Sequence, residues 1–171
     1  MCDDVAVRLL ATDDPATIAA AFSALGWVEP GYRYNSYLSE QQAGSRVCFV
    51  AERGGSFAGH CTLIWTSHYE PFRVAGIPEI SDLNVLPWHR NIGIGSKLLD
   101  AVECAARQRS STIGLGVGLS VDYGPAQRLY VRRGYIPDGR GVIYQHTPVE
   151  SGTRIVIDDD AALMFTRDLR I

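Results

Sequence analysis

The 171-residue sequence lacks any apolar run long enough to cross a bilayer. Its first residues, Met1-Cys2-Asp3-Asp4, are acidic where a secretory signal would be basic. Cysteine is scarce, with no CxxC pair and no regular spacing among Cys2, Cys48, Cys61 and Cys104. The sequence therefore predicts a reduced, cytoplasmic protein with neither a disulfide framework nor a membrane partner.

No sign of charge dominates, because 16 Lys and Arg stand against 19 Asp and Glu, a net charge of −3. Nucleic-acid binding needs a basic surface, so nucleic acid is not an expected partner. The four histidines show no metal-ligand spacing, and no metal is expected. The length, 46% hydrophobic content and lack of low-complexity segments predict one globular domain over residues 1–171.

Apolar periodicity and turn residues predict alternating strands and helices without repeats or linkers. Strands are expected at residues 5–10, 46–52, 57–66, 79–86, 112–119, 142–146 and 163–169. A first helix is expected between an Asp14 N-cap and a Gly26 C-cap, and a second within residues 27–45. Two more are expected at residues 95–109 and from Gly124-Pro125 to Gly134. Gly54-Gly55 predicts a tight hairpin turn, and the segment with Pro71 and Pro78 is expected to be a loop.

The segment 112–119 carries glycines on one face of the expected strand, at Gly114, Gly116 and Gly118. Glycine weakens a strand, so three on one face indicate that something approaches this backbone closely. Tight packing of a helix is the favoured interpretation, and a bound ligand is the other.

The most informative segment runs from Leu83 to Ser96, where a strand ends, a glycine-containing turn follows and a helix begins. Backbone N–H groups in the first turn of a helix lack internal partners and form an anion cradle suited to a pyrophosphate. Arg90 adds a positive charge. The R-x-x-G-x-G pattern alone fits an unliganded turn equally well. There is no G-x-x-x-x-G-K-S/T motif, and the dinucleotide fingerprint lacks its third glycine.

A second motif, Ala126 to Tyr135, reads on its own as a short capped helix with Tyr130 in the core. Together the motifs resemble the GNAT superfamily of N-acetyltransferases, whose pattern is V-x-P, then Q/R-x-x-G-x-G/A, and later A-x-x-L-Y-x-x-x-G-F/Y. The matching residues are Val85-Leu86-Pro87, Arg90 to Gly95 and Ala126 to Tyr135. The resemblance is strongest over residues 79–136.

The resemblance implies an α/β (α+β) single-domain GNAT-like fold. Its mixed central sheet would have about six to seven strands, helices on both faces and splayed central strands. The implied activity is transfer of an acetyl group from acetyl-CoA to a primary amine of a small molecule or peptide, by direct attack in a ternary complex. The alternative is a non-catalytic acyl-CoA-binding regulatory module of the same fold. Family members are often dimers, so a homodimer is compatible with the resemblance.

The resemblance also implies roles for individual residues. Acetyl-CoA would bind through the backbone of Leu83 and Val85, through Ala126, and through the pyrophosphate cradle of Arg90, Asn91, Ile92, Gly93, Ile94, Gly95 and Ser96. A backbone N–H near Val85 would polarise the thioester carbonyl. Tyr130 matches the tyrosine that protonates the departing thiolate, with core packing as the alternative. Glu79 would be the general base, with Asp82, expected on the opposite face of the strand, or a water chain as alternatives.

One position departs from the family pattern, since Tyr123 stands where an asparagine is common. It is expected to stack on the cofactor or hydrogen-bond to it in place of that residue. Candidates for the amine site are Trp27, Tyr32, Tyr34, Trp65, His68 and Glu70. The triplet Asp158 to Asp160 is interpreted as a solvated turn, and no feature selects a particular amine.

Overall fold

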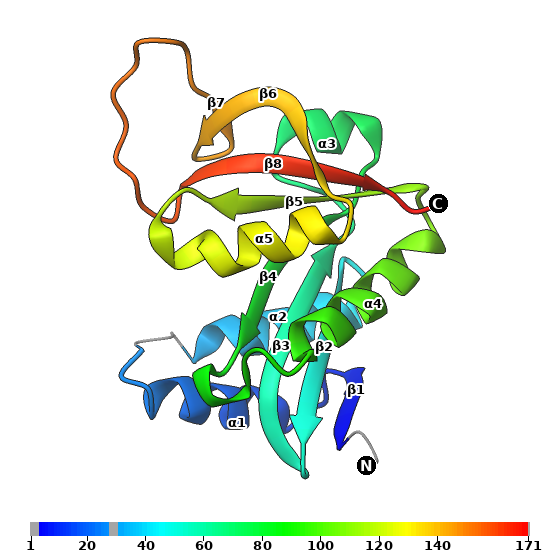
Figure 1. Cartoon of the computed structure of the whole chain (residues 1–171). Helices are drawn as coiled ribbons and strands as arrows, with labels where there is room; N and C mark the ends of the chain where they lie inside the picture. The colour runs from blue at the N-terminus through cyan, green and yellow to red at the C-terminus, as the bar shows by residue number, and fades with distance from the viewer. Residues whose placement is uncertain (1–3, 28–30, 171) are drawn as a thin grey trace. The chain divides into compact units, whose positions relative to one another are not determined.

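The computed structural model describes residues 4–27 and 31–170. The chain forms two compact units (Figure 1). Unit 1 comprises residues 1–64 and 81–105, and unit 2 comprises residues 65–80 and 106–171. Strand β4 (Glu79–Val85) and helix α4 (Ile94–Arg107) contribute residues to both units.

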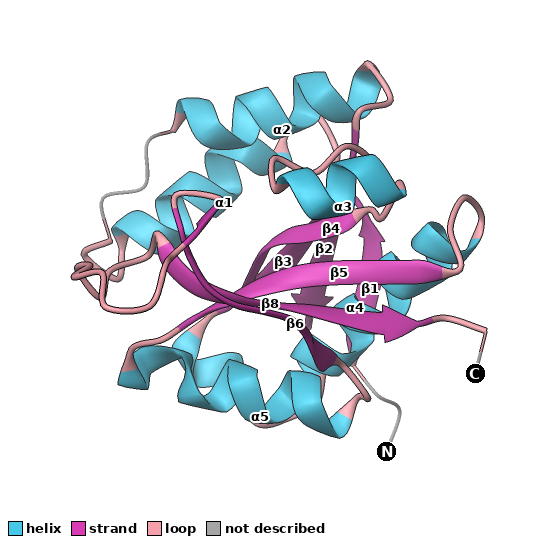
Figure 2. Ribbon diagram, turned by 90° about the horizontal axis from the view of Figure 1, so that it is seen from above, coloured by secondary structure: helices cyan, strands magenta, loops and turns pink. Residues whose placement is uncertain are grey.

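Unit 1 is built on strands in the order β1-β2-β3-β4, with antiparallel β1–β2 and β2–β3 pairs. Its further elements are β1 (Val5–Leu9), α1 (Asp14–Ser23), α2 (Tyr32–Gln42), β2 (Arg46–Arg53), β3 (Ser56–Ile64) and η1 (Pro87–His89). Helices α1 and α2 cover one face of these strands, and α4 lies on the other (Figures 1 and 2). The predicted hairpin turn is confirmed, because Gly54 and Gly55 adopt φ of 58° and 76°.

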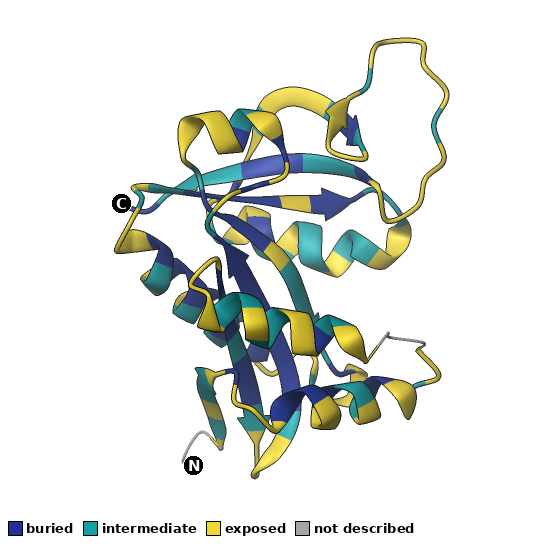
Figure 3. Ribbon diagram, turned by 180° about the vertical axis from the view of Figure 1, so that it is seen from behind, coloured by how far each residue is buried: buried dark blue, intermediate teal, exposed yellow. Residues whose placement is uncertain are grey.

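The core of unit 1 lies between β2 and β3 and the helices α1 and α2. Figure 3 shows buried residues following β2 and β3. The buried cluster contains Leu10, Ile18, Phe22, Tyr34, Cys48, Val50 and Leu86. Cys48 and Cys61 are buried free thiols, and burial raises the pKa of Cys48 to about 12.

The prediction of Asp14 as the N-cap of α1 is wrong by one residue. The N-cap is Asp13, and Asp14 is the first helical residue. The Asp14 carboxylate accepts the Ala11 N–H at 2.6 Å and two hydrogen bonds from the Arg8 guanidinium at 2.6 and 2.8 Å. A partly buried ion pair therefore holds this side chain, which sequence spacing does not reveal.

Unit 2 contains a mixed sheet in the order β4-β5-β8-β6-β7. Its elements are α3 (Glu70–Ala75), β5 (Thr112–Gly118), η2 (Val121–Tyr123), α5 (Gly124–Arg132), β6 (Ile136–Tyr144), β7 (Thr147–Pro148) and β8 (Ala161–Asp168). The β4–β5 pair is parallel and joins Glu79 to Gly114 and Ile80 to Leu115, whereas β8 is antiparallel to β5 and β6. Helices α3 and α5 lie on opposite faces (Figure 2).

The structure of unit 2 differs from the sequence-based predictions in one helix and in the number of strands. The segment predicted as a loop contains α3, which Pro71 opens and Gly76 closes with φ of 65°. Six residues anchored by buried Phe72 are too few to show a helical period. The described residues form eight strands instead of six to seven, because the two-residue β7 pairs with β6.

The glycine face of β5 serves packing, as the favoured interpretation predicted. A Cβ at Gly114 would lie 2.2 Å from the Phe72 ring, and one at Gly118 would lie 2.4 Å from the Tyr123 ring. Gly116 faces the sulfur of Met164, which would lie 3.0 Å from a Cβ. Two aromatic rings, from α3 and η2, thus occupy the space that the absent side chains leave.

Among the described residues, no helix has both the length and the apolar character needed to cross a membrane.

Candidate functional site

The predicted phosphate cradle lies in unit 1, between the end of β4 and the start of α4. Residues 90–93 form an exposed loop, and buried Ile94 anchors the first turn of α4. Asn91 and Gly93 adopt φ of 60° and 90°, and the first helical bond runs from the Lys97 N–H to the Gly93 carbonyl at 3.1 Å. A non-glycine residue in the left-handed region is uncommon, and such turns expose successive N–H groups to one side. These positive φ angles are compatible with the predicted anion cradle.

Arg90 ties this loop back to the strand, since its Nε donates to the Val85 carbonyl at 3.0 Å. Strand β3 also packs closely against the end of β4. A Cβ on Gly59 of β3 would lie 2.6 Å from the Asn84 carbonyl oxygen, so only glycine allows β3 to approach this closely. The backbone predicted to pair with pantetheine therefore belongs to a tightly packed strand end.

Asp82, the alternative base, is engaged in a buried network of unit 1. Its carboxylate accepts hydrogen bonds from the Tyr37 hydroxyl at 3.1 Å and from the Asn84 amide at 2.7 Å, and it lies 3.0 Å from Nε2 of His60. Burial raises the pKa of Asp82, but the charge and hydrogen bond of His60 hold it below its usual range. A carboxylate that is ionised and already holds three donors is a weak proton acceptor.

Strand β4 does not alternate regularly at Ser81 and Asp82. The Ser81 hydroxyl lies 3.0 Å from the Thr62 hydroxyl, and the Asp82 carboxylate lies 3.0 Å from Nε2 of His60. Neighbouring residues of a regular strand point to opposite faces, yet Thr62 and His60 are two residues apart on β3 and share one face. The assignment of Asp82 to a face from alternation alone is therefore unsound.

Glu79, the predicted base, lies in unit 2 and is only 8% exposed. Its carboxylate accepts a hydrogen bond from the Ser67 hydroxyl, and Ser67 in turn accepts the Tyr69 N–H at 2.9 Å. Burial raises the pKa of Glu79, while the Ser67 hydrogen bond and the charges of His146 and His68 lower it in part. A carboxylate with a raised pKa is better matched to accepting a proton near neutral pH.

Tyr130 lies in α5 of unit 2 and is 6% exposed. Its ring packs edge-on against Tyr135, with centroids 5.8 Å apart. Helix α5 is fixed to β5 by Gln127, whose amide donates to the Gly118 carbonyl at 2.8 Å, and Ala126 lies half-buried one residue before it. This burial fits both the catalytic and the core-packing interpretation of Tyr130.

The Tyr123 side chain makes contacts within the fold of unit 2. Its ring packs over Gly118, and its hydroxyl donates to Asp159 at 2.7 Å. The exposed triplet Asp158 to Asp160 forms the predicted solvated turn, where it also accepts the Tyr144 hydroxyl at 3.0 Å.

The amine-site candidates in unit 1 differ in their exposure. Trp27 stacks on Phe22 at 5.5 Å and remains 39% exposed, and Tyr32 is 73% exposed. Tyr34 is 1% exposed and belongs to the core, so its prediction as a site-lining residue is wrong. Its helical spacing is also that of a core residue, which sequence alone does not separate from a binding role.

The candidates in unit 2 lie near Glu79 and at the ends of elements. His68 and Glu70 are exposed, and the Arg109 guanidinium covers Trp65 at 4.0 Å. The sequence does not single out His146, because only the fold brings its ring within 5.7 Å of the His68 ring. Within residues 4–27 and 31–170, no three His, Cys, Asp or Glu side chains gather where they could hold a metal ion.

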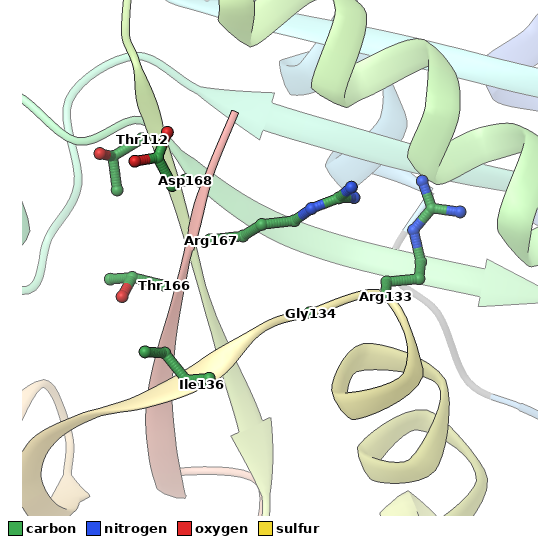
Figure 4. Close-up of a pocket in the computed structure, with 7 residues that line it drawn as sticks. All are labelled: Thr112, Arg133, Gly134, Ile136, Thr166, Arg167 and Asp168. Carbon is green, nitrogen blue, oxygen red and sulfur yellow. The ribbon is translucent and has the colours of Figure 1, made fainter. Parts of the chain in front are cut away.

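A separate hollow of about 500 Å³ lies on unit 2 (Figure 4). It is lined by Thr112, Arg133, Gly134, Ile136, Thr166, Arg167 and Asp168. Arg167 also lies 5.9 Å above the Tyr135 ring, and Arg170 binds Asp168 at 2.6 Å. None of the residues predicted to bind acetyl-CoA or the amine lines this hollow.

The comparisons with known proteins agree with the motif resemblance. Structures similar to this chain include ribosomal-protein-alanine N-acetyltransferase from Brucella melitensis (18% identity, 95% of this chain, 99% of that chain, TM-score 0.70). YncA from Salmonella typhimurium, solved with its cofactor acetyl-CoA, is also similar (18% identity, 98% of this chain, 95% of that chain, TM-score 0.68). Arabidopsis thaliana Naa50 in complex with the bisubstrate analogue CoA-Ac-MVNAL is a third (19% identity, 96% of this chain, 99% of that chain, TM-score 0.65).

At these identities the likeness establishes the fold, an α/β fold with a mixed, open sheet flanked by helices. No curated protein sequence matches the chain. The model of the acetyltransferase (GNAT) family matches residues 14–135, well over half of the sequence. The chain therefore belongs to the GNAT acetyltransferase family.

Proposed function

We propose that this protein transfers an acetyl group from acetyl-CoA to a primary amine by direct attack in a ternary complex. The observation that carries the proposal is the strand–turn–helix segment from Val85 to Ser96 in a GNAT chain, with Asn91 and Gly93 at positive φ before a helix start. Similar structures solved with acetyl-CoA and with a CoA-linked analogue support this ligand.

The cradle fits the CoA pyrophosphate by its chemistry. The N–H groups from Asn91 to Ser96 and the Arg90 charge supply donors and positive potential, and the exposed loop carries glycine where bulk would obstruct an anion. The backbone of Leu83 and Val85 would pair with the pantetheine amides, and Ala126 would contact the cofactor from α5. The Val85 N–H would polarise the thioester carbonyl.

Glu79 and Tyr130 would carry the proton transfers. The Glu79 carboxylate takes a proton from the substrate ammonium, and the freed nitrogen attacks the thioester carbon. The C–S bond then breaks, the Tyr130 hydroxyl gives its proton to the thiolate, and the second proton that the nitrogen loses restores the Tyr130 hydroxyl. We favour Glu79 over Asp82 because burial raises the pKa of Glu79, whereas His60 keeps Asp82 ionised.

Thermal melting with acetyl-CoA, CoA and NAD in parallel tests the binding half of the proposal. A ligand at a hundred times its Kd stabilises the folded state by about 2.7 kcal/mol. We expect both CoA species to raise Tm by several degrees and NAD to leave it unchanged. A shift with NAD alone, or with neither CoA species, would contradict the proposed function.

A pair of glycine variants localises that binding. Gly93→Ala places a side chain at φ of 90° within the cradle and should abolish most of the acetyl-CoA shift. Gly44→Ala is the matched control, because Gly44 follows α2 with φ of 78° and has no atom within 4 Å of its Cβ position. It introduces similar backbone strain and should leave the acetyl-CoA shift intact.

Release of the CoA thiol in the presence of primary amines tests the transfer itself. The amines should include small molecules and peptide α-amines, since the similar Naa50 was solved with CoA-Ac-MVNAL. Acetyl-CoA binding without turnover on any amine would favour a non-catalytic acyl-CoA-binding module instead.

A further inference from the structure

We propose that His68 and His146 form a proton-exit relay that returns Glu79 to its ionised state after each turnover. This inference rests on the proposed function and extends it to two residues that the family motifs do not include. It concerns unit 2 alone, where all three side chains lie.

The stoichiometry of the reaction requires such an exit. An ammonium substrate and acetyl-CoA yield an amide, CoA thiol and one free proton. Of the two protons that the nitrogen loses, one balances the proton that reaches sulfur, and the other must leave for solvent. Glu79 is 8% exposed and bonded to Ser67, so its direct access to bulk water is small.

His68 directly follows Ser67, whose hydroxyl donates to Glu79, and the His146 ring lies beside the His68 ring. Both histidines are exposed, and their ring centroids are 5.7 Å apart. The charges of both act on the Glu79 carboxylate and lower its pKa. Imidazole is the side-chain group that takes up and releases protons near neutral pH. A proton on Glu79 therefore has two neighbouring acceptors that contact water.

The turn that carries His146 is unusual for its sequence. Tyr144 pairs with Thr147 across a two-residue turn, in which Gln145 and His146 have φ of 49° and 63°. Turns of this kind favour Asn-Gly because both central residues need positive φ. Asp160 holds the turn, accepting the Gln145 N–H at 3.1 Å on its carbonyl and the Gln145 amide at 3.2 Å on its carboxylate.

A residue kept in an unfavourable conformation indicates a constraint beyond turn formation. Glycine at position 146 would relieve the backbone, yet it would remove the imidazole beside His68. The turn therefore places the His146 imidazole beside His68 at a backbone position that would suit glycine.

On the neighbouring elements, Arg73, Asp138 and Arg140 have partners of their own. The Arg73 guanidinium of α3 donates to the His68 carbonyl at 3.5 Å. On β6, Asp138 accepts the Tyr69 hydroxyl at 2.9 Å and lies 3.7 Å from Arg140. Glu70 is exposed in the first turn of α3, and β5 carries no charged residue. The histidines are thus the titratable groups whose charges act on Glu79.

The test compares His146→Gly and His68→Gln with wild type in kcat and kcat/KM against pH, using the amine that wild type acetylates fastest and imidazole-free buffers. We expect kcat to fall about tenfold in His146→Gly and to recover in a saturable way when imidazole is added. The acidic limb of kcat/KM should move to higher pH, because the histidine charge no longer lowers the pKa of Glu79. Gln145→Gly is the matched control and should retain wild-type kinetics.

Misfolding does not imitate this result, since glycine suits the backbone at position 146 and the variant should melt no lower than wild type. The relay is wrong, and the proposed function stands, if wild type is active and both His146→Gly and His68→Gln behave like it. In that case the variants show the wild-type kcat and pH profile, and added imidazole has no effect on them. If wild type binds acetyl-CoA but acetylates no amine, the proposed function fails, and the relay falls with it.

Discussion

His60 and Asp82 form a buried pair, with Nε2 of the histidine 3.0 Å from Oδ2 of the aspartate and side chains only 2% and 14% exposed. The rings of Phe22 and Tyr34 pack edge-on against the His60 ring at 5.8 and 5.4 Å. Because Asp82 is ionised, Nε2 carries the proton that it shares with the carboxylate. With the Tyr37 hydroxyl on the same oxygen, the pair joins β3, β4 and α2.

Asp82→Ala should therefore destabilise the protein strongly. Removing one partner of a buried pair costs about 3–5 kcal/mol, because the other polar group stays buried without compensation. Urea denaturation at neutral pH measures the loss. Asp168→Ala is the control. The Asp168 carboxylate pairs with the exposed Arg170 side chain, so its removal should leave the urea midpoint unchanged.

The stability difference between wild type and Asp82→Ala should depend on pH. The folded pKa of Asp82 lies below its usual range, so the pair stabilises the fold above the unfolded aspartate pKa of about 3.9. That contribution is lost as the pH falls through the lower folded pKa. The two stability curves should converge in acid. A difference that persists undiminished at the lowest pH where both proteins fold would show that ionisation of Asp82 is not its source.

Gly114→Ala should destabilise unit 2. A Cβ there would lie 2.2 Å from the Phe72 ring, and Phe72 is itself a fully buried anchor of α3. Overpacking of this kind costs about 1–3 kcal/mol. Gly124→Ala, at the start of α5 with open space around its Cβ position, is the control for a methyl group added without a clash. Equal melting temperatures for the two variants would contradict the packing role of Gly114.

The parts of the fold that sequence predicts are those with a local signal. The Gly54-Gly55 turn, the helix expected at 95–109 and the glycine alternation of β5 each depend on residues close in the chain, and the structure confirms all three. Helix α3 escaped prediction because its six residues place a single side chain, Phe72, in the core.

Contacts between distant segments explain the remaining errors. Asp14 binds Arg8 and the Ala11 N–H instead of capping its helix, and nothing in the spacing distinguishes the two outcomes. Similarly, His146 approaches His68 only because a hairpin turn with positive φ forms far along the chain. The motifs identify candidate residues for the site, whereas their protonation environment requires the structure.

Glu79→Gln should separate catalysis from stability. Burial raises the folded pKa of Glu79, so the ionised carboxylate is less favourable in the folded state at neutral pH than in the unfolded chain. The neutral amide should therefore keep or raise Tm, while kcat falls about a hundredfold or more because the proton acceptor is gone. Melting and thiol-release assays on one preparation measure both. A variant that melts lower and retains wild-type kcat would assign Glu79 a structural role instead.

Tyr130→Phe should lower kcat by about a hundredfold and leave the acetyl-CoA-induced shift in Tm unchanged, if the hydroxyl protonates the thiolate. The ring stays in place, so packing against Tyr135 at 5.8 Å is preserved. Tyr135→Phe is the matched control: it removes the hydroxyl from the other ring of the same buried pair, and it should keep wild-type kcat. A comparison of several amines distinguishes the two roles of Tyr130, because the same CoA thiolate departs whichever amine attacks. The loss in Tyr130→Phe should thus be similar for every accepted amine, whereas a tyrosine that only shapes the amine site would produce losses that vary from one amine to the next.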